Sequence, residues 1–162
     1  LGGAVQTMAR IGEAGFDKEK IANFGMGFLI GGGLDLDWIS VWATPAFHAS
    51  DSSVAIGLIV KASDGTTVYF AGDTGIFGDM ALWALLYPLD LAILPIGGIF
   101  TMDAYQASEA VKLLEPKAVM PVHYASFPII AKTAEEFTKQ CGEKTPGVQV
   151  IASAPGVLVD LE

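Results

Sequence analysis

The chain has 162 residues, of which 52% are hydrophobic and only 17% charged, and its formal net charge is −9 at pH 7. The apolar content excludes an intrinsically disordered chain, and the acidic balance argues against a nucleic-acid binder, because affinity for phosphate depends on Lys and Arg. A mean hydropathy of +0.49 calls either for a membrane or for a partner surface that covers apolar side chains.

Three features of the sequence argue against a membrane and for the cytoplasm. The stretch 80–102 is long enough for a span, but Pro88, Asp90 and Pro95 interrupt it, so it is interpreted as a helix followed by a buried strand. Charged residues within the first fifteen positions argue against a signal peptide. The single cysteine, Cys141, cannot form an internal disulfide, so a reducing, cytoplasmic compartment is expected.

The first half of the chain predicts a helix, an irregular segment and three strands. These lie, in that order, at 4–14, 21–33, 34–44, 54–60 and 67–71. Gly15 is placed to end the helix, and polar and apolar residues alternate over the first strand up to Pro45. The pair Asp64-Gly65 predicts a tight turn that joins the second and third strands into a hairpin.

In the second half, helices and strands alternate. Helices are predicted at 79–86, 104–114 and 133–141, strands at 89–95 and 117–122, and a closing hairpin at 148–151 and 157–159. Asp103 is placed to begin the second of these helices, and Pro116 follows its end. The mixture predicts the α+β class, with one sheet covered by helices on one face and nothing in this pattern to cover the other.

Three residues can carry chemistry at strand ends. The only histidines, His48 and His123, each follow a predicted strand, and Asp73 lies in a turn flanked by Gly72 and Gly75. Imidazole and carboxylate groups held at strand ends suit zinc, iron or manganese. The alternative is that the histidines are surface or capping residues and that Asp73 bonds its own backbone in the turn.

Five ordered segments carry a resemblance to a known family. They are 44–50, 69–80, 90–98, 100–102 and 121–128. Together they resemble the uncharacterised metal-dependent hydrolases of the metallo-β-lactamase superfamily, a branch close to the ascorbate-6-phosphate lactonases. The resemblance implies an αββα four-layer sandwich, of which residues 1–162 form a single domain that is the C-terminal portion.

The resemblance also implies a site. A complete site would hold two divalent metal ions, zinc first, with manganese or iron as alternatives. His48, Asp73 and His123 match three of the metal ligands, Asp73 bridges the two ions, and Asp73 and His123 are the catalytic candidates. A metal-bound hydroxide is the implied nucleophile. Tyr124 and Ser126 are candidates for substrate contact, although core packing is the favoured interpretation of Tyr124.

One motif of the superfamily is absent, namely His-x-His-x-Asp-His, which in relatives stands just before the segment that resembles residues 1–5. We therefore expect that the chain alone is inactive, and that an N-terminal portion or a homo-oligomer covers an open face of the sheet. The implied activity is hydrolysis of a small phosphorylated, lactone or ester metabolite, with neither a membrane nor nucleic acid as partner. The alternative is a non-catalytic subunit or assembly module that keeps the fold without a working metal site.

Overall fold

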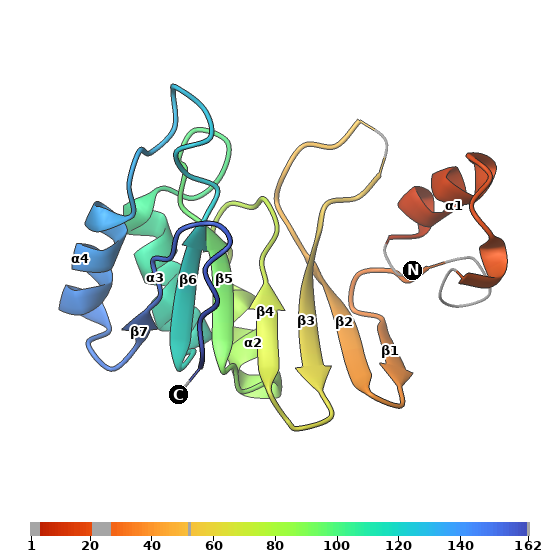
Figure 1. The fold of residues 1–162 in the computed structure, drawn as a ribbon, viewed down its shortest axis with the longest axis horizontal. Helices are drawn as coiled ribbons and strands as arrows, with labels where there is room; N and C mark the ends of the chain where they lie inside the picture. The colour runs from red at the N-terminus through yellow and green to blue at the C-terminus, as the bar shows by residue number, and fades with distance from the viewer. Residues whose placement is uncertain (1–3, 21–26, 52, 162) are drawn as a thin grey trace.

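A single mixed sheet organises the molecule (Figure 1). The computed structural model describes residues 4–20, 27–51 and 53–161. The strands are β1 (Gly33–Leu36), β2 (Ile39–Pro45), β3 (Ile56–Ala62), β4 (Thr67–Phe70), β5 (Leu91–Pro95), β6 (Ala118–Val122) and β7 (Gln149–Val150). The helices are α1 (Val5–Glu13), the short 3-10 helix η1 (Lys18–Lys20), α2 (Met80–Leu86), α3 (Ala104–Leu114) and α4 (Glu135–Lys144).

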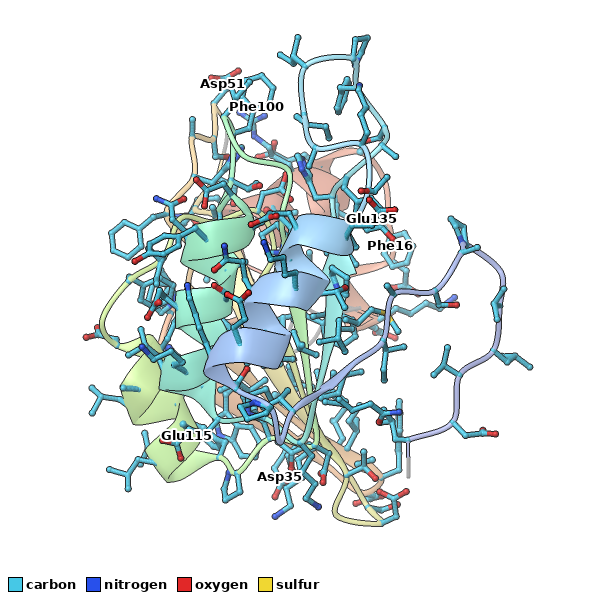
Figure 2. The ribbon with its side chains drawn as sticks, turned by 90° about the vertical axis from the view of Figure 1, so that its left-hand side faces the viewer. Phe16, Asp35, Asp51, Phe100, Glu115 and Glu135 are labelled. Carbon is cyan, nitrogen blue, oxygen red and sulfur yellow. The ribbon has the colours of Figure 1, made fainter. Side chains whose placement is uncertain are left out.

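The strands follow one another across the sheet in chain order. Pairs from β1 to β4 are antiparallel and pairs from β4 to β7 are parallel. Strands β2, β4, β5, β6 and β7 therefore point the same way, and their carboxyl ends lie along one edge, which we call the carboxyl edge. Figure 2 shows Asp51 and Phe100 at this end of the molecule and Asp35 and Glu115 at the other.

One face of the sheet packs against α2, α3 and α4, which lie behind it in Figure 1. Tyr69, Leu94 and Val119 point into this core and are fully buried, together with Leu114 of α3 and Phe137 of α4. A capping box begins α3, because the Asp103 carboxylate accepts a hydrogen bond from the Gln106 backbone and the Gln106 side chain accepts one from the Asp103 backbone. The capping residue and the buried face of α3 thus both favour a helix here, and the helix predicted at 104–114 is confirmed.

The opposite face of the sheet, which we call the open face, is apolar. Side chains alternate along each strand, so the register assigns the following to it: Leu34, Leu36, Ile39, Val41, Ala43, Leu58, Val60, Val68, Phe70, Leu91, Ile93, Ala118 and Met120. The segment after β7 crosses this face in front of β6 (Figure 1). No helix of the described residues covers it, and the sandwich expected from the sequence is represented here by one sheet and one helix layer.

Two predictions are wrong in detail. The strand predicted over 34–44 is a hairpin, β1 and β2, with its turn at Asp37 and Trp38. The error arises because Leu36 pairs with Ile39, so the alternation of polar and apolar residues continues across the two-residue turn. The hairpin predicted over 148–159 does not form, since β7 pairs parallel with β6 and residues 157–159 lie outside any strand, with Leu158 97% exposed.

The physical reason for the second error lies at Gly156. Its φ of +86° turns the chain back over the open face instead of along β7. The remaining predicted elements are present, with α4 displaced by two to three residues toward the C-terminus. Of the segment predicted to be irregular, 21–26 lies outside the described residues. No helix in the described ranges is long and apolar enough to cross a membrane.

Candidate metal site at the carboxyl edge

The three candidate ligands follow strands that share the carboxyl edge. His48 comes shortly after β2, Asp73 after β4 and His123 directly after β6. Two hydrogen bonds join the first two loops, because the Phe47 N–H donates to the side-chain Oγ1 of Thr74 at 2.9 Å and the Gly75 N–H donates to the Phe47 carbonyl at 3.2 Å. The topology therefore brings residues far apart in sequence to one place, as loops on a rigid sheet commonly do.

Asp73 and His123 face each other across this edge. His123 Nε2 lies 3.6 Å from Asp73 Oδ2, which is longer than a hydrogen bond. The imidazole is 19% exposed and the carboxylate 47%. His123 Nδ1 is buried without a hydrogen-bond partner in the structure, an uncommon state for a buried nitrogen. Both groups thus keep lone pairs or protons that the surrounding protein does not use.

The backbone around His123 adopts a conformation that few residues take. His123 has a φ of +56° and Ala125 a φ of +60°, both in the left-handed region. Gly97, which follows β5, allows this geometry, because a Cβ there would lie 2.5 Å from the His123 carbonyl oxygen and 2.7 Å from its Nδ1. Backbone strain of this kind concentrates at functional sites, where the fold holds a side chain in a required direction.

His48 is exposed on the neighbouring loop. Its Nδ1 lies 2.8 Å from the Ala49 carbonyl oxygen, so in the tautomer that donates this bond Nε2 keeps a free lone pair. The structure thus brings Asp73 and His123 together and places His48 beside them without a contact. In the ranges that the structure describes, no three His, Cys, Asp or Glu side chains are grouped closely enough to hold a metal ion.

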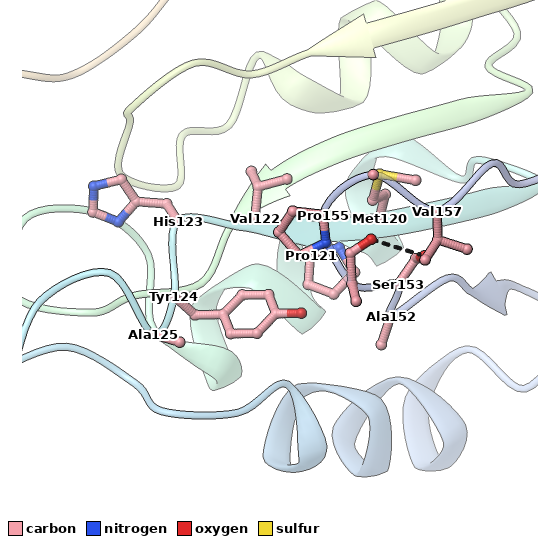
Figure 3. A pocket seen from close by; sticks show the side chains of 12 residues that line it. Met120, Pro121, Val122, His123, Tyr124, Ala125, Ala152, Ser153, Pro155 and Val157 are labelled. Carbon is pink, nitrogen blue, oxygen red and sulfur yellow. Dashed lines mark hydrogen bonds between the residues drawn. The ribbon is translucent and has the colours of Figure 1, made fainter.

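Tyr124 and Ser126, the candidates for substrate contact, follow the last ligand. Tyr124 is half-buried, packs against the main core, and lines a pocket of about 670 Å³ together with His123 and residues 152–157. In Figure 3 the Tyr124 ring and the His123 imidazole point to different sides of the backbone. Core packing of Tyr124 agrees with the favoured interpretation, Ser126 is exposed, and a substrate role for either stays a prediction.

Two residues of the site escaped the sequence analysis. Thr74 is fully buried and its hydroxyl joins the loop after β2 to the loop after β4, while Gly97 makes room for His123. The available signals were the Asp73-Thr74-Gly75 order and the Gly97-Gly98 pair directly after a predicted strand. Elsewhere, Cys141 is not a candidate nucleophile, because burial raises the pKa of its thiol to about 11.

Comparison with known proteins places this geometry in context. A family model described as "Beta-lactamase superfamily domain" matches residues 8–124. A "UPF0173 metal-dependent hydrolase" of Nitratidesulfovibrio vulgaris strain DP4 is 43% identical over 162 residues, which cover 100% of this chain and 67% of that protein. A protein of the same name from Caldivirga maquilingensis is 42% identical over 146 residues, covering 90% of this chain and 63% of that one.

Solved structures give the same result. The chain resembles Igni18, a metallo hydrolase from Ignicoccus hospitalis, with 38% identity and a TM-score of 0.84 over 96% of this chain and 66% of that one. CmlA, a diiron β-hydroxylase from Streptomyces venezuelae, is 14% identical and shares the fold, with a TM-score of 0.66 over 93% of this chain and 36% of that one. The chain spans about two thirds of the length of Igni18 and of the hydrolases compared above.

Proposed function

The chain belongs to the metallo-β-lactamase superfamily, in its UPF0173 branch of metal-dependent hydrolases, and on that basis we propose that Asp73, His123 and His48 hold divalent metal at a hydrolytic site on the carboxyl edge. The observation that carries the proposal is the pair Asp73 and His123, with facing atoms 3.6 Å apart and no hydrogen bond between them. A structural ion pair of the same residues would be expected to close to hydrogen-bond distance.

The donor types fit a divalent metal. Zinc, manganese and iron all accept imidazole nitrogen and carboxylate oxygen, and zinc is the ion that we propose first. The Nδ1 atom of His123 is buried and has no hydrogen-bond partner. This supports the proposal that the fold positions the imidazole to bind a ligand and not only to pack against neighbouring residues. The chemistry supplied by a divalent ion at such a site is a lowered pKa for water and a polarised carbonyl or phosphoryl group.

The described residues supply too few protein ligands for a complete metal site. A catalytic zinc commonly has three protein ligands, and no such group of three exists within the described part of the chain. We propose that a complete site holds two ions, and that the remaining ligands come from polypeptide outside these 162 residues. The same polypeptide, either an N-terminal portion or a second copy of the chain, would cover the open face.

Asp73 and His123 have distinct roles in this proposal. Asp73, with two carboxylate oxygens at an exposed position, suits a bridging ligand, whereas the half-buried ring of His123 is held by the close approach of Gly97. The substrates that we propose are small phosphorylated metabolites or esters and lactones, and the compartment is the cytoplasm, in keeping with a single, buried cysteine.

A second candidate function is a non-catalytic subunit or assembly module that keeps the fold. The observation that favours it is the same shortage of grouped ligands. The two functions differ in metal content, because a module would keep its stability and its partners without a bound ion, whereas an enzyme would lose activity together with the ion.

His123→Ala and Asp73→Asn in the complete gene product test the proposal. Each is expected to reduce bound metal and to lower kcat/KM at least about 100-fold, since even residues that only orient metal ligands cost 10- to 100-fold. Metal content by elemental analysis and hydrolysis of p-nitrophenyl esters are the measurements. Asp37→Asn, in the turn between β1 and β2, is the matched control and should change neither.

The outcomes separate the two functions. A metal-free wild-type assembly whose melting temperature is unchanged by His123→Ala would contradict the metal site and favour the module. Loss of metal and of activity in the two variants, with the melting temperature of the control retained, would support the enzyme.

A further inference from the structure

The turn that contains Asp73 is not held together by the Asp73 carboxylate. An aspartate in a glycine-flanked turn commonly accepts a hydrogen bond from a backbone N–H of the same turn. Within the described ranges no hydrogen bond to the Asp73 carboxylate is present, and the carboxylate faces His123 Nε2 at 3.6 Å. The next side chain, Thr74, makes the local hydrogen bonds instead, which leaves the Asp73 oxygens available to a ligand.

The segment Thr74-Gly75 holds Phe47 at both of its backbone polar groups. The Phe47 N–H donates to Thr74 Oγ1 at 2.9 Å, and the Phe47 carbonyl accepts the Gly75 N–H at 3.2 Å. Phe47 directly precedes His48 in the sequence, and Thr74 directly follows Asp73. Each of these two candidate ligands is therefore one residue, or about 3.8 Å along the Cα trace, from the pair of bonds.

The Thr74 backbone carbonyl extends this connection to the loop after β5. It accepts the Met102 N–H at 3.1 Å, and the Met102 carbonyl accepts the Gly98 N–H at 2.9 Å. Gly98 follows Gly97, which packs against His123. Through its hydroxyl and its carbonyl, Thr74 thus links the loops that carry or support all three candidate ligands.

The Thr74 hydroxyl is not placed to act on a substrate. Thr74 is fully buried, its hydroxyl donates to the Gly75 carbonyl at 2.8 Å, and its oxygen accepts the Phe47 N–H. A hydroxyl has a single proton to donate, and here the protein uses it. The hydroxyl can therefore influence the site only through the positions of the loops that it joins.

We infer that Thr74 is a positioning residue of the candidate metal site. Its hydroxyl fixes the loop of His48 against the loop of Asp73, and it relieves the Asp73 carboxylate of holding the turn. The inference rests on the proposed metal site and deepens it, because it makes the hydroxyl, and not the bulk of the side chain, the determinant of metal affinity. Residues that orient metal ligands typically change affinity by about 10- to 100-fold.

Two substitutions separate the hydroxyl of Thr74 from its methyl group. Thr74→Val keeps the shape of the side chain and leaves the Phe47 N–H without its acceptor, whereas Thr74→Ser keeps the hydroxyl and removes a buried methyl group. Both should lower the melting temperature of the complete gene product by roughly 2–6 °C. Only Thr74→Val should raise the Kd for Zn²⁺, by about tenfold, as measured on the metal-stripped protein by competition with a chromophoric chelator.

Thr67→Val is the matched control. Thr67 is also buried, at 5% exposure, and its hydroxyl donates to the Gly65 carbonyl at 3.2 Å, but it begins β4 at the edge opposite the candidate site. The substitution should lower the melting temperature and leave the Kd for Zn²⁺ unchanged. A general loss of stability therefore cannot imitate the result expected for Thr74→Val.

Hydrogen exchange in the metal-free protein reports on the loop connection itself. The Phe47 amide is expected to exchange at least about tenfold faster in Thr74→Val than in the wild type, because the bond that protects it is lost. In Thr74→Ser the rate should stay at the wild-type value. The measurement uses NMR and needs neither bound metal nor turnover.

The outcomes distinguish failure of the inference from failure of the proposed function. If the wild type binds Zn²⁺ and Thr74→Val binds it equally well, or if Thr74→Ser weakens binding as much as Thr74→Val, the inference is overturned and the metal site stands. Weaker binding by Thr74→Val with unchanged exchange of the Phe47 amide would overturn it too. If the wild type binds no Zn²⁺, the proposed function fails and the inference fails with it.

Discussion

Gly97 is the residue on which the position of His123 depends. A methyl group at this point would lie closer to the His123 carbonyl and ring than real Cβ atoms approach, and the carbonyl belongs to backbone that cannot easily move. His123 is already held in the left-handed region. The same close approach therefore fixes both the backbone and the imidazole direction.

Gly97→Ala is expected to destabilise the protein by about 1–3 kcal/mol, the usual cost of overpacking, and to weaken metal binding by displacing His123. Gly142→Ala is the matched control, because Gly142 lies inside α4 with nothing within 4 Å of the added methyl group. The control should gain about 0.5–1 kcal/mol through reduced chain entropy. Urea unfolding measures both, and equal effects at the two positions would show that Gly97 has no special role.

The residues of the site could be predicted to different extents. His48, Asp73 and His123 could be named as candidates because each follows a predicted strand and matches a ligand position of the family that the chain resembles, and strands that run in parallel end at one edge. The 3.6 Å separation of Asp73 from His123 could not be predicted, because it depends on how Gly97, in the loop after β5, packs against His123. The exposure of Phe47, Phe100 and Phe127 was also not predicted, since a run of apolar residues does not reveal which side chains are exposed.

At the level of strands and helices, Asp90 joins the starts of three neighbouring strands. Its carboxylate accepts the Thr67 N–H at the start of β4, at 2.8 Å, and binds Lys117 Nζ just before β6, at 2.7 Å. Its own backbone pairs with Thr67 and with Ala118. At the edge opposite the site, the Asp90 side chain thus adds two contacts to the backbone pairing that joins β4, β5 and β6.

The pH dependence of stability should reveal this contact. Lys117 first, and then the Thr67 N–H, hold the pKa of Asp90 below its ordinary value. Because the folded pKa is lowered, the stabilisation is present in full above the ordinary Asp pKa of about 3.9 and is lost as the pH falls through the folded value. Asp90→Asn is therefore expected to lower the free energy of unfolding at neutral pH, with the difference from wild type shrinking below about pH 4.

Lys117→Met provides the comparison for Asp90→Asn. It removes one partner and leaves the Thr67 N–H, so it should weaken the acid dependence without abolishing it. Urea unfolding at a series of pH values gives the free energies. A constant difference between wild type and Asp90→Asn down to pH 2 would contradict the role assigned to this carboxylate.

The elements themselves were predictable where local signals and packing agree. Helix α3 was predicted with its observed bounds, because Asp103 caps its start and its buried residues recur at helical spacing. The β1–β2 hairpin was missed because a two-residue turn keeps the alternation in phase, and the last hairpin failed because apolar character at 157–159 does not specify a partner strand. Pairing is a tertiary property, and a periodic pattern does not contain it.

For the molecule as a whole, the open face explains the excess of apolar residues. The helices cover one side of the sheet. On the other side no helix of the described ranges covers the apolar residues of β1 to β4, whereas Leu91 and Ala118 of β5 and β6 are buried against Ile151. An apolar surface of this extent, with a net charge of −9 elsewhere, favours association through the uncharged face. The high mean hydropathy had indicated that some apolar surface must be covered by a partner, but it could not show which surface.

The 162-residue chain alone is therefore expected to self-associate at micromolar concentration, as measured by light scattering. Phe70→Glu places a charge on the open face and should raise the monomer fraction. Leu85→Glu places the same charge on exposed helix α2, on the other side of the sheet, and should have little effect. A clean monomer for the unsubstituted chain, or dispersal by Leu85→Glu alone, would show that the open face is not the contact.

The common direction of β2, β4, β5, β6 and β7 separates two tasks within one sheet. Groups that could act on a ligand sit on loops at the carboxyl edge, while the contacts of Asp90 that hold strand register sit at the far edge. Loops can then be exchanged at one edge with little effect on folding at the other. The architecture is in this sense modular, and the loops after β5 and β6 are the natural place to engineer a new specificity.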